Sequence, residues 1–204
     1  MTQLLLGLAP HPPPSFDNFV FGRNAAALAA LRAFGSSTLP DRCIYLWGEP
    51  GSGCTHLLRA WSTTPARHAV DAVESLDDGA QIELFSLYNR VREGAGHLLV
   101  SGRKPPLQLA LRADLRSRLA WGLSFEIHAL SEDEKRAALA AEARARAMPL
   151  TEDMLSYLMS RARRDMSSLM QVVDALDRLS LESKRPITLA LLREILNQSH
   201  TLAL

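Results

Sequence analysis

Two glycines, a cysteine and a threonine stand at the spacing of a phosphate-binding loop. The segment GEPGSGCT fits the pattern G-x-x-x-x-G-K-[ST] at Gly48, Gly53 and Thr55, but Cys54 occupies the lysine position. Between a strand and a helix, such a loop surrounds phosphates with backbone N–H groups at the positive helix end. An ordinary strand–turn–helix is the alternative. The candidate nucleotide-contacting residues here are Gly48, Pro50, Gly51, Ser52, Gly53, Cys54, Thr55 and His56.

The chemistry of this loop is weakened at two positions. A neutral thiol at Cys54 cannot neutralise the β- and γ-phosphates as a lysine does. Asp71, near the end of the segment HAVDAV, is the candidate to hold Mg²⁺ together with the Thr55 hydroxyl, and a strand-end turn residue is the alternative. Hydrolysing proteins usually carry a second acidic residue next, where this chain has Ala72, and Glu74 is out of step on a strand. We therefore expect nucleotide sensing rather than efficient hydrolysis.

Composition bounds the class of protein and the compartment. The chain has 204 residues and a net charge of +1, which argues against a strongly basic nucleic-acid binder. Cys43 and Cys54 are too few for a disulfide framework and lack metal-ligand spacing. No apolar stretch approaches the ~20 residues of a membrane span. We expect a cytoplasmic protein with no membrane partner.

Apolar patterns place the loop in an α/β domain. Strands are expected over 43–47, 68–73, 97–102 and 123–130, and helices over 24–34, 55–61, 80–94 and 111–122. This alternation predicts a parallel sheet with helices on its faces. From Ser131 onward only helices are expected, with caps at Ser131 (a capping box with Glu134), Thr151 and Thr188. The expected domains are a flexible tail over 1–15, an α/β domain over 16–130 and a small helical domain over 131–200.

The motifs together resemble a known family. The segments FDNFVFGRNAAA, HLLVSG, LRSRLAWGLSFEI and RRDMSSL, with the glycine loop, are similar to the ATPase domain of the bacterial replication initiator DnaA, an AAA+ protein. The resemblance covers nearly the whole chain, without the initiator's C-terminal helix-turn-helix domain. With its glutamine–leucine tail, this plan resembles the Hda family, the regulatory inactivators of DnaA. It implies a P-loop AAA+ parallel sheet with a C-terminal helical lid.

The resemblance assigns roles to residues outside the loop. Ser101 matches the sensor-1 position near the γ-phosphate, and Arg164 matches the sensor-2 arginine of the lid. Arg118 matches the arginine finger, which points into a neighbour's site. Val20 and Phe21 fall, with Gly22, in the segment that packs near adenine. The remaining arginines of these segments are interpreted as surface charges; they are Arg112, Arg116, Arg161 and Arg163.

Two further features follow from the comparison with that family. The tail residues Gln3, Leu4, Leu6 and Leu8 resemble the peptide that docks on the bacterial sliding clamp, with the glutamine amide orienting the peptide and the leucines filling an apolar groove. The link between the loop helix and 68–73 lacks room for the strand and helix that AAA+ domains usually place there. We therefore expect a sheet shortened by one strand–helix unit, with 68–73 as its edge.

The resemblance implies a negative regulator of replication initiation. With the DNA-loaded sliding clamp (the β subunit of DNA polymerase III), it would stimulate ATP hydrolysis on DnaA through Arg118 in trans. Its own site would hold ADP, or ATP, with Mg²⁺ as the implied metal. Whether the chain forms a homo-oligomer is left open by the sequence. No direct sequence-specific DNA binding is expected. The alternatives are an autonomous AAA+ ATPase that loads or remodels a helicase and an inactive DnaA-like paralogue.

Overall fold

The computed structural model describes residues 13–36 and 39–201, with side chains described as far as Asn197. Two compact units divide the chain, one over Pro14–Ala129 and one that begins at Leu130. The first contains α1 (Ala25–Ala33), β1 (Cys43–Trp47), α2 (Cys54–Trp61), β2 (Arg67–Val70), the 3₁₀ turn η1 (Val73–Ser75), α3 (Asp78–Arg92), β3 (His97–Gly102), the 3₁₀ turn η2 (Pro106–Gln108), α4 (Ala113–Leu119) and β4 (Leu123–Glu126). The second contains α5 (Glu132–Ala145), α6 (Glu152–Arg161), α7 (Met166–Ser183) and α8 (Leu189–Thr201).

The first unit is built on a parallel sheet of four strands, as predicted. The strand order is β2-β3-β1-β4, so the strand that carries the glycine loop lies inside the sheet. At its carboxyl end, Trp47 pairs with Gly102 of β3 and with Glu126 of β4. The strand β2 lies at the edge, as expected for a sheet that lacks the usual additional strand.

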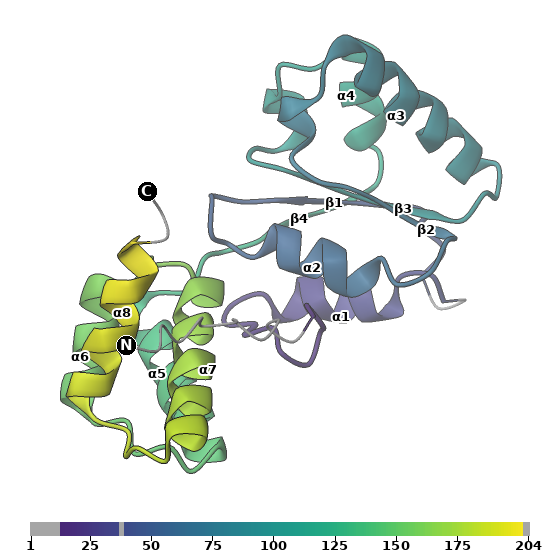
Figure 1. Ribbon diagram of the computed structural model, residues 1–204. Helices are drawn as coiled ribbons and strands as arrows, with labels where there is room; N and C mark the ends of the chain where they lie inside the picture. The colour runs from purple at the N-terminus through teal and green to yellow at the C-terminus, as the bar shows by residue number, and fades with distance from the viewer. Residues whose placement is uncertain (1–12, 37–38, 202–204) are drawn as a thin grey trace. The chain divides into compact units, whose positions relative to one another are not determined.

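Helices cover both faces of this sheet. Figure 1 shows α1 and α2 on one face and α3 and α4 on the other. Alternate side chains of β1 supply the two cores: Tyr45 packs in the cluster with α3 and α4, and Leu46 packs in the cluster with α1 and α2. Both side chains are fully buried. Because β1 is buried on both faces, its sequence CIYLW is continuously apolar rather than alternating.

Several element boundaries differ from the sequence-based expectation. The strand β2 ends at Val70 rather than at residue 73, because Ala72 adopts a left-handed conformation (φ 50°) and the chain turns into η1. The strand β4 ends at Glu126 rather than at residue 130, and the bond from Ile127 N to Trp47 O is the last that joins this segment to β1. Asn24 is the N-cap residue of α1, as predicted, but its side chain makes no hydrogen bond to that helix.

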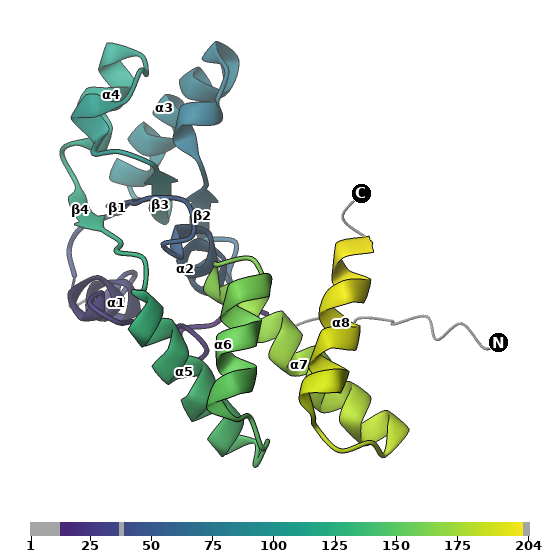
Figure 2. The ribbon, with the colours of Figure 1, turned by 90° about the vertical axis from the view of Figure 1, so that its left-hand side faces the viewer.

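The second unit is entirely helical, and α5–α8 pack around one apolar core (Figure 2). Its helix starts agree with the sequence. Ser131 and Glu134 form a reciprocal capping box, and Thr151 and Thr188 each accept a backbone N–H of the helix that follows. Each cap satisfies one of the unpaired N–H groups of a first helical turn. None of the helices described in either unit is long and apolar enough to cross a membrane.

Candidate functional site

The glycine loop connects β1 to α2, and its shape depends on two glycines. A Cβ on Gly48 would lie 2.3 Å from the carbonyl oxygen of Ile127, so no side chain fits there. Gly53 has a φ of 103°, and a Cβ on it would lie 2.7 Å from the ring of Phe19. The loop therefore ends in a left-handed residue directly before α2, which leaves the first N–H groups of that helix facing outward as a phosphate cradle requires.

The thiol at the lysine position is neutral. Burial raises the pKa of Cys54 to about 11, and the carboxylates of Asp71 and Glu74 add to the rise. The hydroxyl of Ser52 lies 3.5 Å from the Cys54 sulfur. Cys54 therefore carries no charge near neutral pH, so the loop itself supplies neither a cation nor an anion at this position.

Residues from three elements meet at the carboxyl end of the sheet. The Thr55 hydroxyl donates to Asp71 Oδ2 at 2.7 Å, and the Ser101 hydroxyl donates to Asp71 Oδ1. The backbone N–H of Ala72 also donates to Asp71 Oδ1, at 3.0 Å. The structure thus brings together three of the predicted site residues, from α2, the end of β2 and β3. Asp71 directly follows β2, and its role as a metal ligand stays a prediction.

This group suits magnesium only in part. Thr55 and Asp71 offer two oxygen atoms as possible metal ligands, and these atoms are hydrogen-bonded to each other. Mg²⁺ is commonly held by one or two carboxylates together with substrate phosphates and water. No cluster of three or more His, Cys, Asp or Glu side chains exists among the residues that the structure describes. Any Mg²⁺ here would therefore be held by Asp71 and Thr55 jointly with a nucleotide, which would supply the other oxygen ligands.

Glu74 lies at the same end of the sheet, in the 3₁₀ turn η1 rather than on a strand. Because η1 follows the left-handed Ala72, the chain folds back toward the end of β3. Glu74 Oε2 lies 3.1 Å from the point that a Cβ on Gly102 would occupy. The other oxygen, Oε1, forms an ion pair with Arg103 Nε at 3.2 Å. This placement depends on the left-handed turn at Ala72, which no sequence pattern indicates.

Phe19, a residue that the sequence analysis did not single out, brings the segment before α1 against the loop. The Phe19 ring contacts Gly53 and lies 5.4 Å from the ring of His56. His56 Nε2 also lies 2.9 Å from the Ser15 carbonyl oxygen. Phe21 is 53% exposed, and the structure records no contact between it and the loop, so its proximity to an adenine ring stays a prediction, as does that of Val20.

Asn24 holds this segment in place. Its side chain donates to His128 O and accepts from His128 N, both at 2.9 Å, across 104 residues of sequence. Asn24 is 3% exposed, so both bonds are shielded from water. The residue predicted as a helix cap instead joins the start of α1 to the chain that leaves β4.

Arg118 lies at the opposite end of the sheet from the glycine loop. It precedes β4, whose first residue Leu123 pairs with Ile44 at the amino end of β1. The loop begins after Trp47, at the other end of the same strand. Strands rise by about 3.3 Å per residue, so the three steps from Ile44 to Trp47 alone separate the two ends by roughly 10 Å. Arg118 therefore does not point into the phosphate site of its own chain.

Two aromatic rings, those of Trp121 and Phe85, lie against Arg118 and are called the aromatic shelf below. Its guanidinium lies 4.6 Å from the centre of the Trp121 ring and 5.9 Å from that of Phe85 on α3. Arg92 stacks on the same tryptophan at 5.6 Å. Trp121 is nevertheless 64% exposed, and Arg118 forms no ion pair with any described residue. The result is a half-buried cation, held by aromatic rings, whose charge is not cancelled within the described chain.

Comparison with known proteins decides the family. Residues 132–196 match the sequence model of a family described as "Hda, lid domain". A Haemophilus influenzae protein described only as uncharacterized is 31% identical over 228 residues, a match that covers 96% of this chain and 98% of that protein. The chain belongs to the Hda and DnaA-related AAA+ family. The resemblance inferred from the sequence motifs is thereby confirmed.

Solved structures agree with the family at the level of the fold. Domain III of Thermotoga maritima DnaA is 17% identical and superposes with a TM-score of 0.71, covering 92% of this chain and 97% of that one. DnaA from Aquifex aeolicus, described as bound to AMPPCP, is 17% identical with a TM-score of 0.65 over 85% of this chain and 70% of that one. The T. maritima RuvB branch-migration motor is 16% identical and superposes with a TM-score of 0.60, covering 91% of this chain and 72% of that one. These likenesses confirm the predicted AAA+ sheet with a helical lid.

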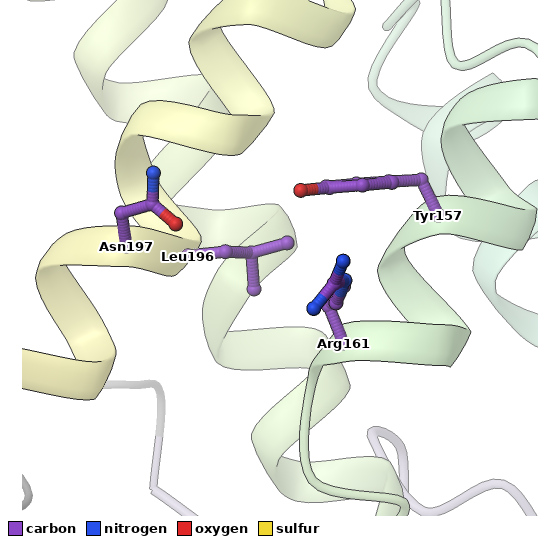
Figure 3. A pocket seen from close by; sticks show the side chains of 4 residues that line it. All are labelled: Tyr157, Arg161, Leu196 and Asn197. Carbon is purple, nitrogen blue, oxygen red and sulfur yellow. The ribbon is translucent and has the colours of Figure 1, made fainter.

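In the lid of this family member, the described arginines differ in their surroundings. Arg164 lies between α6 and α7, and its charge contributes to holding the pKa of Glu132 below its usual range, behind the larger effect of Lys135. Arg161 lines a cavity of about 240 Å³ with Tyr157, Leu196 and Asn197, and Figure 3 shows the Tyr157 ring and the Arg161 guanidinium pointing toward Leu196. The sensor role of Arg164 stays a prediction. The glutamine–leucine tail, with Gln3, Leu4, Leu6 and Leu8, lies outside the described residues.

Proposed function

We propose that this chain is a negative regulator of replication initiation that stimulates ATP hydrolysis on DnaA. In this proposal Arg118 acts in trans, as the arginine finger at the nucleotide held by the initiator. The charge that develops on the transferred phosphoryl group is stabilised by such a cation, which is worth about 10³–10⁵ in rate in other NTPase systems. Hydrolysis would convert the initiator to its ADP form and so prevent repeated initiation.

The position of Arg118 is the observation that carries this proposal. It lies at the amino end of the sheet, while the chain's own glycine loop lies at the carboxyl end. It is also held on Trp121 without a carboxylate partner among the described residues. A cation that is presented at the surface, away from its own phosphate site, is suited to a site on another molecule.

The chain's own loop is proposed to hold nucleotide rather than to hydrolyse it. The neutral Cys54 removes the charge that promotes phosphoryl transfer, and Ala72 stands where a water-activating carboxylate is usual. The backbone cradle between β1 and α2 is intact, so a diphosphate is the expected occupant, with Mg²⁺ held jointly by Asp71 and Thr55. We propose ADP as the nucleotide and Arg164 as the lid residue that responds to it.

The sliding clamp is proposed as the second partner. Gln3, Leu4, Leu6 and Leu8 would dock on it as an extended peptide, and the prolines at 12–14 would space the peptide from the AAA+ domain. Tethering on DNA-loaded clamp would raise the local concentration of the regulator near the origin-bound initiator. The regulator itself is expected to act in the cytoplasm and to make no sequence-specific DNA contacts.

The test is single-turnover hydrolysis of radiolabelled ATP pre-bound to DnaA, with DNA-loaded clamp and this protein. Wild type is compared with Arg118→Ala and with Arg116→Ala, which removes the same charge from the same helix two residues earlier. We expect acceleration that is lost in Arg118→Ala, retained in Arg116→Ala and absent without clamp.

The outcome also separates the alternatives. If correctly folded wild type does not accelerate hydrolysis on DnaA, the proposal fails. Robust hydrolysis by the chain alone would then favour an autonomous ATPase that loads or remodels a helicase. The absence of both activities would favour an inactive paralogue.

A further inference from the structure

The proposed phosphate site has too little positive charge for its ligand. Cys54 is neutral where a lysine is usual, and the carboxylates of Asp71 and Glu74 both act electrostatically on it. A nucleoside diphosphate would bring further negative charge to the same place. The backbone N–H groups of the loop offset only part of this repulsion, because they carry partial charges. A side-chain cation from elsewhere in the AAA+ unit would offset more of this repulsion.

Arg103 is placed to supply that cation. It directly follows Gly102, the last residue of β3, and Gly102 pairs with Trp47 at the end of β1. The N–H of Gly48, the first glycine of the loop, donates to the Gly102 carbonyl at 3.2 Å. Because neighbouring strands lie about 4.8 Å apart, the backbone that carries Arg103 begins beside the loop.

The contact that Arg103 makes in this structure is incomplete. Its Nε lies 3.2 Å from Glu74 Oε1, and its two Nη groups have no partner among the described residues. Its side chain is 70% exposed, while that of Glu74 is 26% exposed. Glu74 Oε2 is buried and has no hydrogen-bond partner. An arginine usually bonds a carboxylate or a phosphate through two parallel N–H groups, so one contact leaves most of its donors unused.

We propose that Arg103 binds the phosphates of the nucleotide in place of the missing loop lysine. The guanidinium leaves Glu74, or shares it, when phosphate oxygens offer it a second pair of acceptors. The planar fork of an arginine suits two oxygens of one phosphate, whereas a lysine would act as a point charge. The inference rests on the nucleotide-holding part of the proposed function and is independent of the action of Arg118.

Lys104 provides a control of the same charge. It follows Arg103 and is also exposed, and its backbone carbonyl accepts the hydroxyl of Tyr45 at 2.9 Å. A side-chain substitution keeps that carbonyl, so Lys104→Ala removes one positive charge while the backbone contact persists. A general electrostatic effect would affect both positions equally, and a specific phosphate contact affects Arg103 alone.

The experiment measures the affinity of the full chain for fluorescent mant-ADP by titration, with circular dichroism of each variant as the check on folding. We expect Arg103→Ala to weaken binding by about 10- to 100-fold, the scale of a lost charge-assisted contact. Arg103→Lys retains part of the affinity, and Lys104→Ala changes it by less than about threefold. Glu74→Gln binds more tightly than wild type, because the competing carboxylate charge is removed.

A charge relocation completes the test. In the Arg103→Ala background, Cys54→Lys is expected to restore affinity, because it returns a cation to the usual loop position. Equal losses in Arg103→Ala and Lys104→Ala, an unchanged affinity in Arg103→Ala, or no rescue by Cys54→Lys would each overturn the inference. Wild type that does not bind mant-ADP would overturn it together with the nucleotide-holding role. The Arg118 assay on DnaA is read separately, so a failure here does not decide that activity.

Discussion

Replacing Trp121 tests whether the aromatic shelf positions Arg118. The Arg118 guanidinium lies 4.6 Å from the centre of the Trp121 ring, and the tryptophan is 64% exposed. A cation–π contact at an exposed site contributes about 0.5–1 kcal/mol. If this contact holds the guanidinium in its working orientation, its loss lowers the stimulated rate by about two- to fivefold, since about 1.4 kcal/mol corresponds to tenfold.

The assay is the single-turnover hydrolysis on DnaA with clamp described above. Trp121→Ala is expected to reduce stimulation about two- to fivefold, and Trp121→Phe to recover part of it because a ring face remains. Leu107→Ala is the control, since Leu107 is also exposed (69%) and makes no contact with Arg118 that the structure records. The reasoning is refuted if Trp121→Ala matches wild type while Arg118→Ala abolishes stimulation.

Stability and reactivity give further expectations. Asn24→Ala should lower the free energy of unfolding by about 1–3 kcal/mol, because both backbone groups of His128 lose their partner. Urea unfolding followed by tryptophan fluorescence reports on the unit Pro14–Ala129, and an unchanged midpoint would contradict this expectation. Because burial raises the pKa of Cys54 to about 11, its alkylation by iodoacetamide should accelerate about tenfold per pH unit from pH 7 to 10. A plateau near pH 8 in a peptide-resolved mass measurement would show an ionised thiol instead.

Local sequence signals predicted the elements that local interactions determine. The strands 43–47 and 97–102 agree with the structure, since each is a short apolar run next to residues that end a strand. The capping box of Ser131 and Glu134 depends on residues three apart, and it is present. The meeting of Thr55, Asp71 and Ser101 follows from the parallel sheet, whose carboxyl ends share one edge.

Contacts between distant segments were not predictable in this way. Asn24 has the residue type and position of a helix cap, and only the fold reveals that it bonds to His128. Glu74 reaches the end of β3 because Ala72 takes a left-handed conformation, for which an alanine gives no signal. Phe19 contacts the glycine loop at Gly53, and the motifs of the sequence did not single it out. In each case the deciding partner lies far along the chain or depends on a turn of unusual conformation.

The short edge strand has a consequence for how this protein behaves in solution. Within the described residues, β2 spans only Arg67–Val70 and has β3 on one side alone. A free strand edge is a template on which another chain can add a strand and start aggregation. Here the free edge of β2 is only four residues long, and its first two residues are Arg67 and His68. The Arg67 guanidinium bonds to the Trp61 carbonyl and lies over the Trp61 ring. A sheet shortened by one strand can thus keep an edge that is too short, and that begins with a cation, to recruit another strand readily.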